Sequence, residues 1–150
     1  MSKAKSKVIT VVGPTGVGKT WEVFERFPHI YNPGYSARGM KRAGFWEPSQ
    51  NAILIDNFCG GINIAEFLRM LEGGSIYVNT RDGCRRVHFE YIIIASSTQP
   101  QEWFQPNGTP KRMAAIQKLF SRIGWGTERL VFASSRDELH AKLDRAFESH

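Results

Sequence analysis

KVITVVGPTGVGKT, residues 7–20, carries the strongest structural signal in this chain. Residues 7–12 are a short β-branched run that ends at Gly13, which predicts a fully buried strand. Residues 19–27 predict a helix that ends before Pro28, because the residue before a proline disfavours helical backbone. A glycine-rich turn therefore connects a buried strand to a helix.

That turn, GPTGVGKT, fits the pattern G-x-x-x-x-G-K-[ST] at every fixed position. Its glycines allow backbone N–H groups to converge on phosphate oxygens, and the N-terminus of the helix adds partial positive charge. Lys19 would reach the β- and γ-phosphates and the Thr20 hydroxyl would bind Mg²⁺, whereas the alternative is a chance glycine-rich turn. The predicted cofactors are ATP and Mg²⁺, and the predicted binding residues are Gly13, Pro14, Thr15, Gly16, Val17, Gly18, Lys19 and Thr20.

A second apolar run, AILID at residues 52–56, ends in the carboxylate of Asp56. We expect Asp56 to hold the metal through water beside Thr20, although apolar strands often end in Asp without any function. Asn57 follows where many ATPases of this type place a second acid. An amide orients water but takes no proton at neutral pH, so Asn57 either positions the attacking water or only caps a turn.

A third apolar run, YIIIA at residues 91–95, is followed by Ser96 and Ser97. In this ATPase layout, a polar residue at such a strand end senses the γ-phosphate from between the two strands described above. We therefore interpret Ser97 as a catalytic residue. The alternative is a strand that simply leaves the core through two serines.

The remaining elements alternate in the same way. We predict helices at residues 63–72, 111–122 and 137–147, a strand at 129–133, and a loop with one short strand at 31–50. Residues 75–80 and 84–90 flank Arg81-Asp82-Gly83, which is a strong hairpin signal. The fold class is α/β: a P-loop NTPase of the ASCE or AAA+-like type, with a mostly parallel sheet flanked by helices and an inserted β-hairpin.

The hairpin concentrates positive charge. Arg81, Arg85, Arg86 and His88 fall within eight positions, which suits contact with the phosphates of single-stranded DNA. A charge cluster is often no more than a solvated face, and this remains the alternative.

Composition agrees with a polyanionic partner but does not name one. The chain has 150 residues, a net charge of +6 and a pI near 9.6. We expect a single domain over residues 1–150, with residues 1–6 as a flexible tail. Cys59 and Cys84 are too few for a disulfide scaffold, and we see neither a secretory signal nor a membrane span, so we expect an intracellular protein without a membrane partner.

Taken in order, these motifs resemble the superfamily 3 helicase domain of replication-associated proteins from circular single-stranded DNA viruses, circoviruses in particular. The matching stretches cover about 120 of the 150 residues. They are GPTGVGKT at 13, ILIDNF-x-G ending at 60, V-x-T-R-x-G at 78–83, IIIASSTQPQEWF at 92, and LFSRI at 119–123 followed by LVF at 130.

The resemblance implies specific roles. Arg81 falls at the basic residue of the DNA-contacting hairpin, Ser97 at the position of a conserved asparagine, and Arg122 at the arginine thought to reach a neighbouring subunit's nucleotide. Family members form rings, usually hexamers, and move 3′ to 5′ along single-stranded DNA. The resemblance thus implies a DNA-dependent ATPase or helicase that assembles as a homo-oligomer, in the host nucleus if viral.

This chain departs from the family pattern at two positions. Asn57 replaces an acid and Ser97 replaces an amide, and no paired-His motif or Tyr nucleophile of a nicking domain precedes Val8. Two other interpretations stay open, and these departures favour the first of them. One is a nucleotide-binding assembly module with little hydrolysis. The other is a small-molecule P-loop kinase with a lid at residues 31–50 carrying Arg38 and Arg42.

Overall fold

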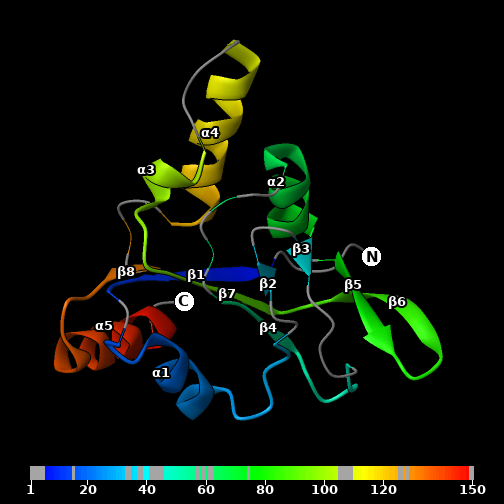
Figure 1. Ribbon diagram of the computed structural model, residues 1–150, viewed down its shortest axis with the longest axis horizontal. Coiled ribbons are helices and arrows are strands. Elements are labelled where there is room, and N and C mark those ends of the chain that lie inside the picture. Colours follow the sequence, from blue (N-terminus) through cyan, green and yellow to red (C-terminus); the bar gives the residue numbers. More distant parts are fainter. Residues whose placement is uncertain are drawn as a thin grey trace.

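A four-stranded parallel sheet forms the centre of the molecule, in the strand order β4-β7-β1-β8 (Figure 1). The computed structural model describes residues 6–14, 16–32, 35–36, 39–40, 46–56, 58, 60, 63–73, 75–104, 110–124, 127 and 129–148. The sheet strands are β1 (Lys7–Val12), β4 (Ala52–Ile55), β7 (Tyr91–Ser96) and β8 (Leu130–Phe132).

The sheet is buried on both faces, which explains why its strands are apolar throughout rather than alternating. β4 is fully buried, and β1 and β7 are buried except at their first residues. β7 pairs with β4 on one side and with β1 on the other. The prediction that the strand before Ser97 lies between the other two is therefore confirmed.

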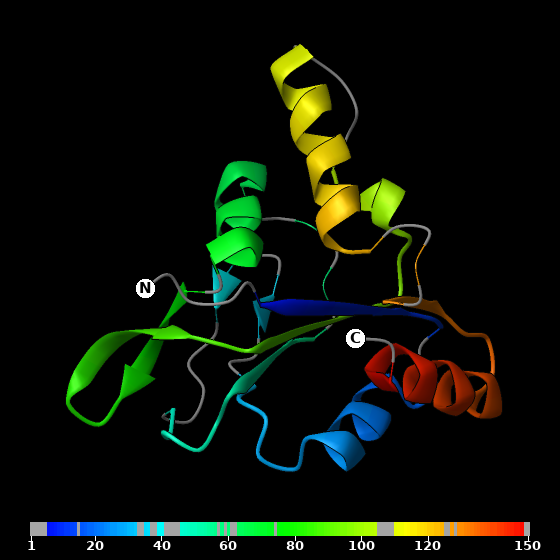
Figure 2. The same cartoon turned by 180° about the vertical axis from the view of Figure 1, so that it is seen from behind.

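Helices cover the two faces in separate layers (Figures 1 and 2). α1 (Lys19–Arg26) and α5 (Arg136–Glu148) pack below the sheet as seen in Figure 1. α2 (Ile64–Gly73), α3 (Pro100–Trp103) and α4 (Pro110–Arg122) lie above it. The predicted α/β fold with a parallel sheet covered on both faces is confirmed. No helix within the described residues is long and apolar enough to cross a bilayer.

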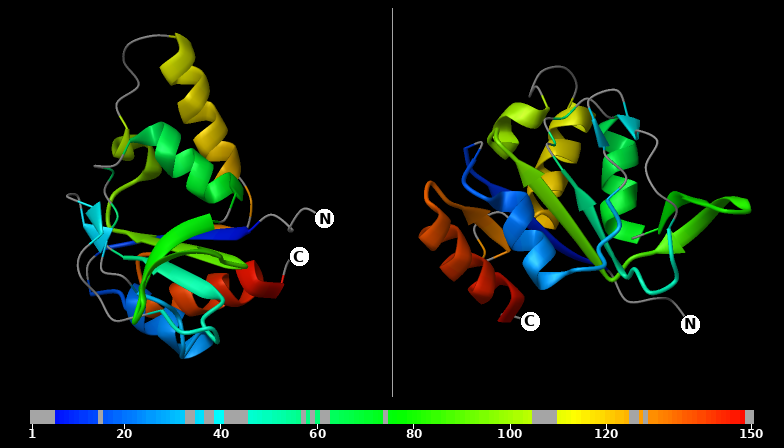
Figure 3. Two further views of the ribbon diagram at one scale, coloured as in Figure 1. Left: turned by 90° about the vertical axis from the view of Figure 1, so that its right-hand side faces the viewer. Right: turned by 60° about the horizontal axis from the view of Figure 1, so that its bottom comes forward.

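A hairpin of β5 (Ser75–Thr80) and β6 (Gly83–His88) projects beyond the sheet, as Figure 1 and the right-hand view in Figure 3 show. Thr80 pairs with Gly83, so the turn itself is Arg81-Asp82. Gly83 has a φ of 131°, a conformation that favours glycine. It is the first residue of β6 and is not part of the turn. The predicted hairpin is confirmed with this shift of one residue.

Several local features differ from the sequence predictions. The predicted loop at 31–50 contains two short strands, not one: β2 (Tyr35–Ser36) pairs antiparallel with β3 (Gly39–Met40). α3 was not predicted. Ser6 does not belong to a flexible tail, because it is buried and its hydroxyl donates to the Phe89 carbonyl at 2.5 Å. Residues 1–5 lie outside the described residues.

Candidate functional site

Three chain segments that follow parallel strands meet at one edge of the sheet. Lys19 Nζ donates to Ser97 Oγ at 3.4 Å, and Thr20 Oγ1 lies 3.1 and 3.2 Å from the two Asp56 carboxylate oxygens. The carboxyl ends of parallel strands share one edge, which is where ligands bind in open α/β sheets. Together these side chains line a hollow of about 250 Å³ with Gly16, Gly18 and Trp21.

Lys19 is the most enclosed of these groups. Its side chain is buried, and its ammonium donates to the Gly13 carbonyl at 2.7 Å and to the Pro14 carbonyl at 2.9 Å. Burial lowers the pKa of Lys19 from its ordinary value, and the charge of Asp56 offsets part of that effect. The loop thus holds the Lys19 ammonium, largely removed from water, in the wall of the hollow.

Glycine is required in this loop for two different reasons. A Cβ on Gly13 would lie 2.4 Å from the Ala133 carbonyl, so the loop after β8 approaches too closely for any side chain. Gly18 precedes α1 with a φ of 95° and carries no side chain to cap the helix. The first turn of α1 therefore has no side-chain cap, and an uncapped helix N-terminus is an arrangement that suits an anion.

Ser96 fixes the strand end that carries Ser97. It is fully buried, and its hydroxyl donates to the Phe58 carbonyl at 2.5 Å while it accepts from the Trp103 indole N–H at 3.1 Å. The Phe58 N–H donates in turn to the Ala95 carbonyl at 2.9 Å. Ser96 therefore ties the segment after Asp56 and helix α3 to β7, which sets the distance between Asp56 and Ser97.

An ion-pair cluster holds α1 against α5. The buried carboxylate of Glu22 accepts from Arg26 Nη1 at 2.8 Å and lies 3.0 Å from His140 Nδ1, and Arg26 also pairs with Asp144. Burial raises the pKa of Glu22, but the hydrogen bonds from Arg26 and His140 outweigh it and leave that pKa below its ordinary value. This clamp fixes the direction of α1, and so of the loop before it.

The donor set at the hollow fits a magnesium ion that binds together with a nucleotide. Within the described residues no group of three His, Cys, Asp or Glu side chains is placed to hold a metal. Mg²⁺ binds through one or two protein oxygens and completes its shell with water and phosphate oxygens. Thr20 Oγ1 and the Asp56 carboxylate, already within hydrogen-bond distance of each other, suit that coordination.

Of the predicted site residues, the structure brings together Lys19, Thr20, Asp56 and Ser97. Thr15 and Asn57 lie outside the described residues, as do Arg38 and Arg42. Arg122 lies elsewhere: it is in the last turn of α4, and its Nη2 donates to the Leu71 carbonyl near the end of α2 at 2.7 Å. Within its own chain Arg122 therefore links two helices.

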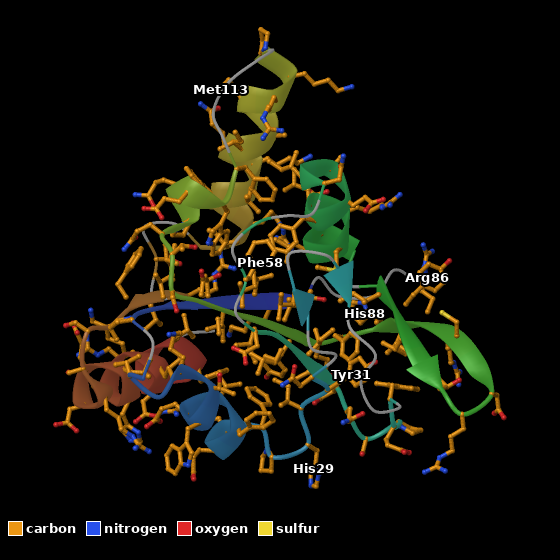
Figure 4. All side chains as sticks on the ribbon, viewed as in Figure 1. His29, Tyr31, Phe58, Arg86, His88 and Met113 are labelled. Carbon is orange, nitrogen blue, oxygen red and sulfur yellow. The ribbon has the colours of Figure 1, made fainter. Side chains whose placement is uncertain are left out.

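The hairpin arginines do not form one patch. In the β5–β6 register Tyr77 faces Arg86 and Val78 faces Arg85, so the two arginines point to opposite faces. Arg86 places its guanidinium 5.1 Å from the ring centroid of the exposed Tyr77. Arg86 and His88, two positions apart on β6, share one face (Figure 4).

The opposite face of the hairpin borders a hollow of about 360 Å³. There the Arg85 guanidinium lies 6.0 Å from the Trp46 ring centroid, and Arg81 and Thr80 complete the wall near the turn. Each face of the hairpin thus has an arginine beside an aromatic ring. Proteins that bind single-stranded nucleic acids use these two groups together, because the ring stacks on bases and the arginine contacts phosphates.

Sequence reasoning missed the aromatic members of both regions: Trp21 beside Thr20, Tyr77 on the hairpin, and Trp46, which lies before β4 and contacts the hairpin through Arg85. Tyr77 could have been found, because strict alternation in residues 76–78 places it opposite the buried Ile76 and Val78. Trp21 and Trp46 acquire meaning only through partners that are distant in the sequence.

Comparisons with known proteins find distant relatives of this chain. No protein family model matches the chain. The chain is 26% identical over 132 residues to the replication-associated protein of Porcine circovirus 1, a match that covers 79% of this chain and 36% of the relative. The corresponding protein of Porcine circovirus 2 is 25% identical over 81% of this chain and 38% of its own length, and that of Goose circovirus is 28% identical over 67% and 33%.

This chain therefore spans little more than a third of the curated relatives it matches. The similarities indicate a distant relationship to circovirus replication-associated proteins.

Proposed function

We propose that this chain is a nucleotide-driven motor domain that acts on single-stranded DNA in viral replication. It would be a P-loop ATPase of the superfamily 3 helicase type. The observation that carries the proposal is the convergence of Lys19, Thr20, Asp56 and Ser97 in one hollow at the carboxyl edge of the sheet. The relationship to proteins named for replication supports the biological setting.

In this proposal each residue has a defined task. The N–H groups of the β1–α1 loop and of the start of α1 bind phosphate oxygens, and Lys19 exchanges its carbonyl partners for the β- and γ-phosphates. Thr20 and Asp56 would hold Mg²⁺, which would neutralise charge on the phosphates. Ser97, already within reach of Lys19 Nζ, donates a hydrogen bond to an oxygen of the transferred phosphoryl group.

The test is the ATPase rate of the parent chain with and without single-stranded DNA, beside Lys19→Ala and a matched control. Lys118→Ala serves as the control, because Lys118 is exposed on α4 and pairs only weakly with Glu72 at 3.3 Å. We expect DNA-stimulated turnover in the parent and in the control. Lys19→Ala should weaken MgATP binding about 100-fold, since a charge-assisted hydrogen bond to phosphate is lost. Parental binding by Lys19→Ala would rule out the proposal.

A second candidate function is a nucleotide-binding assembly module that hydrolyses slowly. It is favoured by the described lining of the hollow, in which Asp56 is the only carboxylate and already accepts from Thr20. Without a second acid at Asn57, the chain would bind ATP and assemble but turn it over poorly. Turnover by the parent and by Asn57→Asp separates the two functions. A silent parent that Asn57→Asp activates supports the module, and an active parent supports the motor.

For DNA, the proposal places the strand along the β5–β6 hairpin. Arg81 at the turn contacts the phosphate backbone, and Tyr77, with Arg86 over its ring, offers a stacking surface for bases. Ring assembly rests on the resemblance and is tested through Arg122 below.

A further inference from the structure

The hollow at the sheet edge continues past the phosphate-binding groups to an indole ring. Trp21 directly follows Thr20, lines the same hollow, and has 53% of its surface exposed. Exposed tryptophan is uncommon because the ring carries a large apolar area. The motor proposal assigns this ring no task, because phosphates and magnesium do not use an aromatic surface.

Arg136 holds that ring in place. It is the first residue of α5, and its guanidinium lies 4.1 Å from the Trp21 ring centroid, well within cation–π distance. A Cβ on Gly18 would lie 3.7 to 3.9 Å from the Nε, Cδ and Cγ atoms of Arg136, so the side chain runs alongside the phosphate loop.

The arginine is itself anchored. Its Nε lies 3.7 Å from the buried Glu22 carboxylate, and α5 is held at its start because Ser135 Oγ accepts from the Glu138 N–H at 3.2 Å. The Glu138 carboxylate accepts from the Ser134 N–H at 2.8 Å and pairs with Lys142 at 2.9 Å. A ring and a guanidinium fixed in this way lose little freedom when a flat ligand stacks on them.

We infer that Trp21 and Arg136 form the surface that binds the purine base of the nucleoside triphosphate. The inference rests on the proposed function, because it adds the base to a site whose phosphate end is already assigned. A purine is flat, polarisable and larger than a pyrimidine, so it gains more from stacking on an indole and from a neighbouring guanidinium. The surface therefore selects purine over pyrimidine nucleotides.

The test separates the base from the phosphates. Binding of MgATP, MgCTP and magnesium tripolyphosphate is measured by calorimetry for the parent, Trp21→Ala, Trp21→Phe and the control Met113→Ala, which removes an exposed apolar side chain on α4. We expect Trp21→Ala to weaken MgATP about tenfold, MgCTP less, and tripolyphosphate not at all. Trp21→Phe retains most of the affinity, and Met113→Ala binds all three ligands as the parent does.

The outcomes distinguish the two proposals. If the parent binds neither ATP nor tripolyphosphate, the phosphate site itself is wrong and this inference falls with it. If the parent binds both and Trp21→Ala changes neither, only the base surface is wrong. An equal loss of affinity for ATP and tripolyphosphate in Trp21→Ala also overturns the inference, because it shows a damaged loop. Retention of ATP affinity by Trp21→Phe but not by Trp21→Ala supports stacking.

Discussion

The carboxyl edge of the sheet and the β5–β6 hairpin are built in opposite ways. At the sheet edge Lys19 is buried, as is Glu22 on the helix that follows, and contacts within the chain already engage both. On the hairpin, Arg81, Arg85 and Arg86 are exposed and lie beside aromatic rings or at the turn. A small rigid ligand with fixed charges needs the first kind of site, whereas a long flexible polyanion is served by the second.

The largest predicted effect concerns Arg122, and it tests whether the nucleotide site at the sheet edge needs an arginine from a second chain. In an assembled sample Arg122→Ala should lower ATP turnover by about 10³-fold if the arginine reaches a neighbour's nucleotide. Its loss should cost only about 1 kcal/mol of stability, because a single hydrogen bond to the Leu71 carbonyl disappears. Arg122→Lys can still donate to that carbonyl but lacks the planar fork.

Turnover and thermal unfolding of both variants are therefore compared in samples whose mass shows assembly. Unchanged turnover in Arg122→Ala would leave Arg122 with the helix-linking role alone and would show the sheet edge to be self-sufficient.

The next largest effect concerns the close approach at Gly13. Gly13→Ala should destabilise the fold by about 3 kcal/mol, since its Cβ would lie 2.4 Å from the Ala133 carbonyl. Gly83→Ala on the hairpin meets no atom within 4 Å and should cost about 1–2 kcal/mol, from its positive φ alone. Denaturant unfolding of both variants measures the two costs. Equal losses of stability would contradict the close approach of the backbone at Gly13 and the open surroundings of Gly83.

Glu22 should make stability depend on pH. Its pKa in the folded protein lies below the unfolded value of about 4.3, so its contribution is complete above that value and is lost as the pH falls through the lowered pKa. Glu22→Gln should remove about 2 kcal/mol at neutral pH and flatten the acid limb of the stability curve. Unfolding measured from pH 7 down to pH 3 checks this. An acid limb as steep as that of the parent would show that other carboxylates dominate.

The smallest effects are expected on DNA binding by the hairpin. Tyr77→Ala should weaken single-stranded DNA about tenfold without changing the salt dependence, since it removes stacking. Arg81→Ala should weaken all sequences equally by a few fold and lower the slope of log affinity against log salt by about 0.7. Fluorescence anisotropy at several salt concentrations separates the two. A sequence-selective loss in Arg81→Ala would mean that it contacts bases and not the backbone.

Much of the sheet edge could be predicted from the sequence because its signals are local. Residues 13–20 carry a fixed spacing. Asp56 directly follows one uniformly apolar run and Ser97 follows another after a single serine, and such runs are typical of buried strands. Parallel strands then bring their ends together without further information.

The pairings that complete each region were out of reach for a physical reason. Arg136, near the C-terminal end of the chain, stacks on Trp21 near its beginning. Arg85 on the hairpin contacts Trp46 in the irregular segment before β4. Exposed side chains carry no hydrophobic period, so neither their partners nor their direction is written in the pattern. Helix α3 was missed because four residues are too few to show a helical period.

The position of β7 has a mechanical consequence. Only two residues separate the end of the hairpin at His88 from the start of β7, which leads to Ser97 at the hollow, and β1 and β4 pair with β7 on its two sides. β7 cannot slide without breaking two ladders at once, so it forms a stiff connection between the hollow at the sheet edge and the projecting hairpin. In the motor proposed above, the hairpin would therefore move only with the whole domain, as a rigid tilt of one subunit against the next.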